Sequence, residues 1–351
     1  MWSVPYFLKI TRQERKQLAD NIDEISHYLG KMLLEPLKKQ FIGKKRLIIS
    51  PDGASALIPF ETLILDKEPL ITTHNVNYVQ SLSVLALLKK REKQYQTIEN
   101  QGSILAMGAA RYESPGQMIK RKQCNQSQRN LQYNLETLSR NLSDPERYYQ
   151  RAYKALDIAW CDLPGTEKEL SEIETIFADE QPLIFRNKQA TEAKLQKLNK
   201  QGILTHYRYL HFSAHGYLSV ETPALSALVL DQLTKSKNTD GFITASEWPS
   251  YNLKSDLMVL SACQTGLGKV VRGEGIMGLP YALYVAGNKN TLLTLWSVLD
   301  DSTADFMTSF FKKLKHGMSQ IDALSATKRE FLNSEKYQRP LFWAPFVLYG
   351  I

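Results

Sequence analysis

The chain has 351 residues, of which 43% are hydrophobic and 23% are charged, a balance typical of a globular protein with a substantial core. It carries 44 lysines and arginines against 36 acidic residues, a net charge of +8. This excess does not gather on a recognition element, so we expect no direct nucleic-acid binding. No run of about 18 apolar residues is present, which excludes a membrane-spanning helix, and no secretory signal is evident, so a cytoplasmic location is expected.

The N-terminal part of the chain predicts one long helix followed by short strands. Leucines and isoleucines recur every three or four residues from Leu18 to Leu37, which predicts a helix over residues 12–40 that Pro36 kinks near its end. Strands are predicted at residues 47–50, 76–79 and 104–107, with a helix over residues 83–94. Residues 111–140 are polar and predict a surface insertion, with a regulatory or activation-nick role as the alternative to a tolerated loop.

After residue 163, short apolar strands alternate regularly with helices. The first helix is predicted over residues 166–177, with Thr166 and Glu169 as a capping box. Strands follow at 183–185, 209–213, 227–230, 257–261, 291–295 and 346–349, and helices at 191–198, 274–285, 302–315 and 319–333. This order predicts an α/β fold with a mainly parallel sheet covered by helices on both faces.

Two of these strands end in residues suited to nucleophilic chemistry. The segment YLHFSAHG (residues 209–216) delivers His215, and DLMVLSACQTG (residues 256–266) delivers Cys263. Because working residues gather at the carboxyl ends of parallel strands, the two would face one cleft if their strands are neighbours. The imidazole would promote ionisation of the thiol and later protonate a leaving amine. Backbone N–H groups of Gly216 and Cys263 could hold the developing oxyanion.

Structural interpretations compete with these roles. A lone cysteine at a strand end is commonly a buried small hydrophobe, and a histidine there often caps the strand. His211 and His215 form a His-x3-His pair, but on a strand this spacing makes no metal-binding face, so we interpret His211 as structural. The run Gly266 to Lys269 fails the phosphate-loop pattern, so no nucleotide, metal or other cofactor is expected. The three cysteines cannot all pair, form no CxxC motif and suit a reduced compartment.

Several segments in a fixed order resemble one known family. YLHFSAHG and VLSACQTGLG are followed by GEGIMGLPYALYVAG (residues 273–287) and LWSVLDDST (residues 295–303), a combination that resembles the CHAT family of caspase-like domains. The family's opening, middle and closing segments are resembled by LIISPDGASALIPFETL (residues 47–63), LPGTEKELSEI (163–173) and FWAPFVLYG (342–350). The resemblance covers residues 25–351. Such domains are commonly found in prokaryotes behind tetratricopeptide repeats and are related to separase and the caspases.

The resemblance implies a caspase-like α/β/α sandwich and a cysteine endopeptidase with a Cys–His dyad, matched here by Cys263 and His215. It implies an N-terminal helical segment (residues 1–40), a degenerate caspase-like half (41–160, including the polar insertion) and an active half (161–351). We expect the tetratricopeptide-repeat module that usually precedes such a domain to be absent or to lie on a partner. We therefore expect the enzyme to be latent until a protein partner or signal activates it, in a prokaryotic defence or regulatory system, and to cleave a protein substrate.

The resemblance to separase also implies a role for the segment LWSVLDDST. In such enzymes this segment lines the pocket for the residue before the cleaved bond, and its acid selects a basic side chain. Asp301 is the preferred selector and Asp300 the second, with the indole of Trp296 as a flat apolar wall. The alternative is that both aspartates cap the helix that begins near Ser302.

Two other functions fit the same residues. A caspase-like fold that retains the dyad could be a non-catalytic scaffold or interaction module, and an acyltransferase would share the first half-reaction of a peptidase. Alkylation by a peptide chloromethyl ketone would separate the scaffold from an enzyme. Detection of hydrolysed rather than transferred product would separate the two enzymes.

Overall fold

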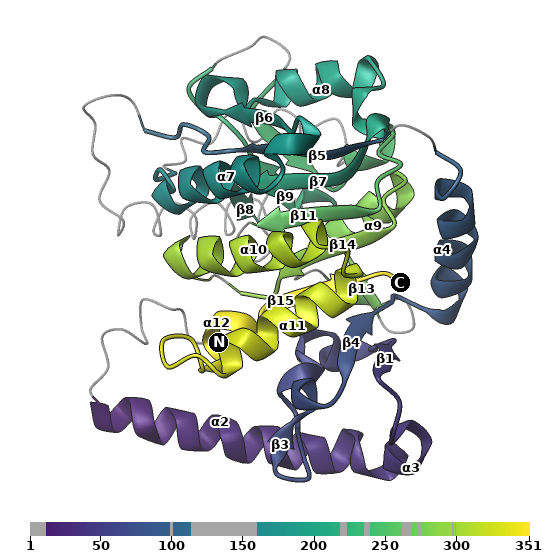
Figure 1. Cartoon of the computed structure of the whole chain (residues 1–351), viewed down its shortest axis with the longest axis vertical. Helices are drawn as coiled ribbons and strands as arrows, with labels where there is room; N and C mark the ends of the chain where they lie inside the picture. Colours follow the sequence, from purple (N-terminus) through teal and green to yellow (C-terminus); the bar gives the residue numbers. More distant parts are fainter. Residues whose placement is uncertain are drawn as a thin grey trace, which may run out of the picture.

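The computed structural model describes residues 12–98, 101–113, 160–217, 223–234, 239–261, 269–271, 275–296, 298 and 300–351. Eight strands form its central sheet: β1 (Arg46–Ile49), β4 (Asn75–Tyr78), β5 (Gly102–Gly108), β6 (Leu183–Arg186), β7 (Tyr207–Ser213), β11 (Leu257–Ser261), β14 (Asn290–Thr294) and β15 (Phe346–Tyr349). Their order across the sheet is β1-β4-β15-β14-β11-β7-β5-β6 (Figure 1). Every neighbouring pair is parallel except β14 and β15. The predicted mainly parallel sheet is confirmed.

Helices cover both faces of this sheet. The α-helices are α2 (Arg12–Leu33), α3 (Lys38–Phe41), α4 (Leu82–Tyr95), α7 (Pro164–Ile176), α8 (Glu192–Lys200), α9 (Leu279–Val285), α10 (Asp300–Lys315), α11 (Gln320–Leu332) and α12 (Pro340–Trp343). The apolar sides of α7, α10 and α11 pack on one face, where the three helices lie one below another in front of the strands (Figure 1). The opposite face is covered by α8 and α9. Strands enclosed in this way must be apolar on both faces, which explains their near-continuous hydrophobic runs.

Local sequence signals account for several helix boundaries. Ser81, Thr191 and Ser319 each precede a helix, and their side-chain oxygens accept the backbone N–H three residues later. The predicted N-terminal helix is present as α2, and a 3-10 turn containing Pro36 separates it from α3. A proline removes a backbone donor and clashes with the preceding turn, so the helix cannot continue through it. No described helix is both long and apolar enough to span a bilayer.

Two predicted elements in the second half are wrong in detail. Residues 227–230 form β9 (Ala227–Val229), which joins β8 (His215–Tyr217) and β10 (Phe242–Thr244) in a separate antiparallel sheet. The connection from β8 is too short for the crossover that a parallel neighbour requires. The helix predicted over 274–285 begins only with α9, because β13 (Gly275–Met277) pairs with β12 (Lys269–Val271). Pro280 is tolerated in the first turn of α9 but not in a helix interior.

The predicted capping box at the start of α7 is also wrong. The helix begins at Pro164, a residue suited to the first helical position, and the hydroxyl of Thr166 donates to the carbonyl oxygen of Leu163 at 2.6 Å. Glu169 therefore lies in the second turn, too far along to return to the N-cap. Its side chain points into the sheet instead, where it accepts hydrogen bonds from two strands.

The sheet mixes strands from the two predicted halves of the chain. The strands β1, β4 and β5 come from residues 41–160, whereas the other five come from residues 161–351. The strand β5 lies between β7 and β6, so the halves share one sheet. The boundary at residue 160 stays a prediction, and the polar insertion lies outside the described residues beyond Glu113.

A buried ion pair joins the N-terminal part of the chain to α11. The ammonium of Lys328 lies 2.6 Å from Oε1 of Glu61, and both side chains are only 1% exposed. The hydroxyl of Tyr78 in β4 donates to the other oxygen of this carboxylate. Burial lowers the pKa of Lys328, and the charge of Glu61 opposes that effect. Each charge is tolerated in the interior only because its partner is held beside it.

Replacement of Lys328 by methionine should therefore destabilise the protein strongly. The substitution leaves the Glu61 carboxylate buried without its cation, a change that typically costs about 3–5 kcal/mol. Urea denaturation of wild type and variant measures the difference. The double variant Glu61→Gln/Lys328→Met should recover part of the loss, because no unpaired charge remains. A single variant within about 0.5 kcal/mol of wild type would contradict this account.

Candidate active site

The carboxyl ends of β7 and β11 lie side by side in the sheet. The two strands are parallel neighbours from the pair Tyr209–Leu257 to the pair Ser213–Ser261. Along the sequence, His215 follows Ser213 by two residues, and Cys263 follows Ser261 by the same two-residue step. The condition set in the sequence analysis, that these two strands are neighbours, is therefore met. Cys263 itself lies outside the described residues.

The imidazole of His215 is packed between two aromatic rings. It is 7% exposed, and the ring centroids of Tyr112 and Trp160 lie 4.7 and 5.0 Å from its own. The hydroxyl oxygen of Tyr112 also accepts the backbone N–H of His215 at 3.2 Å. The same hydroxyl donates to the carbonyl oxygen of Val229 at 2.7 Å. Both the ring and the backbone of His215 are thus held in one orientation.

A main-chain carbonyl determines which nitrogen of His215 carries the proton. Nε2 lies 2.7 Å from the carbonyl oxygen of Cys161. A carbonyl oxygen can only accept a hydrogen bond, so Nε2 is the donor and Nδ1 is the basic nitrogen of the neutral ring. The group that orients His215 could not be predicted from the sequence, because every residue has a backbone carbonyl.

The sulfur of Cys161 is disulfide-bonded. Cys161 is the only cysteine among the described residues, so its partner lies outside them. This bond contradicts the expectation that the cysteines are reduced. Because Cys161 borders His215 through its carbonyl, thiol chemistry in this region has to be measured in the presence of a reductant.

His211 and Gly216 lie in the consecutive strands β7 and β8. Gly216, the predicted oxyanion donor, is half-buried in β8 opposite Leu228. His211 is fully buried, with its ring edge-on to Phe311 at 5.3 Å, and its Nε2 lies 2.9 Å from Oε1 of Glu169. Within the described ranges, no group of three His, Cys, Asp or Glu side chains could hold a metal ion.

The predicted specificity segment leaves the sheet beside β11. Its strand β14 is the parallel neighbour of β11, so Trp296 emerges at the same edge. Trp296 is half-buried, and its Nε1 donates to the carbonyl oxygen of Leu341 at 3.4 Å. Both aspartates lie in the first turn of α10, and Asp301 is exposed. A hydrogen bond to Asp305 raises the pKa of Lys168, and the charge of Asp301 adds to this effect.

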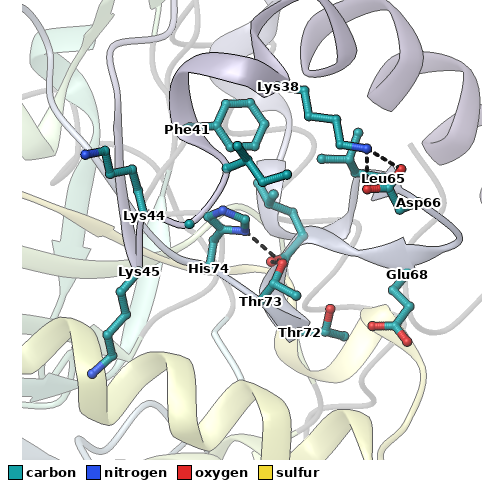
Figure 2. Close-up of a pocket in the computed structure, with 13 residues that line it drawn as sticks. Lys38, Phe41, Lys44, Lys45, Leu65, Asp66, Glu68, Thr72, Thr73 and His74 are labelled. Atoms are coloured by element: carbon teal, nitrogen blue, oxygen red, sulfur yellow. Dashed lines mark hydrogen bonds and ion pairs between the residues drawn. The ribbon is translucent and has the colours of Figure 1, made fainter.

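A separate pocket of about 380 Å³ lies in the N-terminal part, between α3 and the hairpin of β2 (Ile64–Leu65) and β3 (Glu68–Pro69). Lys38 is already paired with Asp66 at 2.6 Å. Figure 2 shows the ammonium groups of Lys38, Lys44 and Lys45 pointing in different directions, so they do not converge on one anion. His74 lines the pocket but is buried. None of the predicted catalytic residues lines this cavity.

Comparisons with known proteins identify short and distant likenesses. Tetratricopeptide repeat protein 28 of Mus musculus and that of Homo sapiens are each 29% identical over 108 residues, or 31% of this chain and 4% of theirs. The Saccharomyces cerevisiae separase–securin structure aligns with 87% of this chain and 15% of its own, at 14% identity and a TM-score of 0.46. The complex of Porphyromonas gingivalis RgpB pro- and mature domains aligns with 97% and 77%, at 8% identity and a TM-score of 0.44.

The chain spans only a small fraction of the length of the curated relatives it matches. The two solved structures are too distant in sequence and in structure to support any statement about its activity. A family match is far more extensive. The model of the CHAT domain matches residues 23–351, nearly the entire sequence. The chain therefore belongs to the CHAT domain family.

Proposed function

We propose that this CHAT domain is a cysteine endopeptidase in which Cys263 is the nucleophile and His215 is the general base and acid. The observation that carries the proposal is the register of β7 and β11. Ser213 pairs with Ser261, and in the sequence each serine precedes one member of the dyad by two residues. Parallel strands end at the same edge of a sheet, where catalytic residues of such folds gather.

The orientation of His215 supports the same chemistry. With Nε2 bound to the carbonyl of Cys161, Nδ1 takes the thiol proton and leaves a thiolate on Cys263. The sulfur attacks the scissile carbonyl carbon, and the N–H groups of Gly216 and Cys263 stabilise the oxyanion. The C–N bond then breaks as the imidazolium gives its proton to the leaving amine. Water, deprotonated by the same nitrogen, hydrolyses the thioester and releases the acid product and the free thiol.

Removal of either dyad member should abolish cleavage without unfolding the protein. We expect Cys263→Ala and His215→Ala each to remove detectable turnover, since loss of an acid–base group alone typically lowers the rate by roughly 10²–10⁴-fold. The double variant should be scarcely worse than Cys263→Ala, because the two groups act as a unit. Wild type and variants are incubated under reducing conditions with the proteins encoded beside the chain, and cleaved products are identified by mass spectrometry.

The other two cysteines, Cys124 and Cys161, provide matched controls. Cys161→Ala keeps the backbone carbonyl that binds His215 and should retain activity in the presence of a reductant, as should Cys124→Ala. Undiminished cleavage by folded Cys263→Ala would end the peptidase assignment. Wild type that cleaves nothing and resists a peptide chloromethyl ketone would favour the scaffold function instead.

We further propose that the enzyme cleaves after a basic residue. Asp301 is exposed at the start of α10, and Trp296 leaves the sheet next to β11. A carboxylate beside an indole suits a guanidinium in charge and in shape. Lys168 lies close enough for the charge of Asp301 to raise its pKa, so a substrate arginine would compete with this lysine.

Asp301→Asn should reduce cleavage after arginine by at least about tenfold, because a bound substrate would cover this exposed carboxylate, and losing a charged partner in a desolvated site typically costs about 2–5 kcal/mol. A peptide library with varied residues before the cleaved bond measures the preference, and a melting curve measures stability. Asp300→Asn serves as the comparison at the adjacent position. If Asp301 only caps the helix, its variant will melt earlier and keep its preference. A wild-type preference for acidic or small residues would refute basic selectivity altogether.

Activation by a partner is proposed to involve α2. One face of this helix leaves four apolar side chains 42–62% exposed, those of Ile22, Ile25, Tyr28 and Met32. The opposite face packs on the β2–β3 hairpin so closely that a Cβ at Gly30 would collide with the Ile64 carbonyl. An exposed stripe at this spacing suits the apolar face of an amphipathic helix of the partner.

The purified chain should accordingly show little turnover alone and gain activity with its partner. Ile25→Glu should weaken that activation at least about tenfold, because it puts a charge into an apolar contact. Leu87→Glu, at a similarly exposed apolar side chain of α4, is the matched control (57% and 53% exposed). Strong cleavage of varied peptides by the isolated chain would contradict latency, and equal loss in both variants would contradict the assignment to α2.

A further inference from the structure

One buried carboxylate contacts both strands that lead to the proposed dyad. Glu169 of α7 is 2% exposed. Its Oε2 accepts the hydroxyl of Ser213 at 2.8 Å and the hydroxyl of Ser261 at 3.0 Å. These serines are the last residues of β7 and β11 and lie opposite each other in the register. A single oxygen therefore connects the ends of two strands at their final paired position.

The second oxygen of this carboxylate faces a buried histidine. Oε1 of Glu169 lies 2.9 Å from Nε2 of His211, which is 0% exposed. Isolating an acidic side chain from water is unfavourable unless polar groups surround it. Three side chains from two strands lie around this one: the hydroxyls of Ser213 and Ser261 donate to Oε2, whereas His211 lies beside Oε1 at 2.9 Å without forming a hydrogen bond. The two serine hydroxyls are thus held by one carboxylate oxygen.

We propose that Glu169 is a positioning residue for the Cys263–His215 dyad. The hydrogen-bond partners of its carboxylate among the described residues are Ser213 and Ser261, so any effect on the dyad would pass through these serines. The carboxylate fixes Ser213 relative to Ser261, and each serine stands two residues before one member of the pair. Glu169 thereby holds together the two strand ends that precede the imidazole and the thiol in the sequence. This inference rests on the proposed function, because it assigns Glu169 to that same site.

The chemistry of the two hydroxyl contacts suggests a graded set of variants. Glutamine at position 169 retains one oxygen that can accept both serine hydroxyls, whereas leucine retains none. The pair Ser213→Ala/Ser261→Ala removes the donors and leaves Glu169 in place. A misplacement of about 1 Å in a catalytic pair can lower the rate by about 10²-fold. We therefore expect kcat to fall about 10- to 100-fold in Glu169→Leu and in the double serine variant, with KM unchanged, and much less in Glu169→Gln.

Glu61→Gln is the matched control for loss of a buried carboxylate. Glu61 is 1% exposed and binds Lys328 and Tyr78, which belong to α11 and β4. Its variant should lose stability and keep the kcat of the folded protein. If Glu169→Leu lowers thermal stability as Glu61→Gln does but keeps kcat within about threefold, its role is structural and the inference is overturned.

A second measurement does not depend on peptide cleavage. After reduction, the rate of iodoacetamide alkylation of Cys263 is followed against pH by peptide-mapped mass spectrometry. In wild type the imidazole should hold the apparent pKa of this thiol below that of a free cysteine, and Glu169→Leu and the double serine variant should move it back upward. Glutamine at position 169 should restore most of the wild-type profile.

The two failures have different signatures. If wild-type Cys263 titrates as an ordinary thiol and no cleavage is found, the proposed function fails. If wild type has a lowered thiol pKa that Glu169→Leu and the serine variants leave unchanged, the positioning role fails while the dyad stands. A fall in activity that appears in KM alone would likewise contradict positioning, because it would place Glu169 in substrate binding.

Discussion

The parallel register of β7 and β11 controls the geometry of the whole sheet edge from which His215 emerges. Evenly spaced hydrogen bonds fix each residue of one strand against the other, and a slip of one residue would turn every side chain to the opposite face. With Ser213 opposite Ser261, both hydroxyls lie within reach of Glu169. On the other side of β7, a Cβ at Gly108 would collide with the carbonyl of Ser213, so only glycine permits β5 to approach there.

Groups far apart in the sequence orient His215 on this edge. Tyr112 follows β5, Trp160 and Cys161 precede α7, and Val229 belongs to the small antiparallel sheet. Each contributes a different constraint, namely a ring face, a carbonyl acceptor or an anchored hydroxyl. Because the acceptor at Nε2 is a backbone oxygen, the tautomer of the imidazole depends on the path of the chain and not on the side chain of residue 161.

Charged side chains of α11 connect this helix to the N-terminal part of the molecule. The pair Glu61–Lys328 is reinforced by Arg329, which donates to the carbonyl oxygen of Ile71 at 2.7 Å and to Asn75 at 2.6 Å. Both cations project from α11, which packs on the same face of the sheet as α7 and α10. Separating α11 from the N-terminal part would leave the Glu61–Lys328 charges unpaired in the interior. These contacts therefore hold the N-terminal part against the helix that covers the sheet.

The amino-acid sequence by itself determined the local elements. Apolar periodicity identified β11 and β15 at their observed bounds, and the serine or threonine that caps α4, α8 and α11 is a local feature of the same kind. It also identified His215 and Cys263 as residues that follow strand ends. These features depend on residues within a few positions of one another, which is why they can be predicted from the sequence alone.

Only the tertiary structure decided the partners across the fold. Glu169 has the spacing of a helix cap, and its role depends on strands 44 and 92 residues away. The Cys161 carbonyl meets His215 across 54 residues, and β9 pairs with β8 rather than entering the central sheet. Hydrogen-bond partners at such separations are chosen by packing and strand order, and backbone acceptors are chemically identical at every position. Their selection therefore leaves no pattern in the sequence that would predict it.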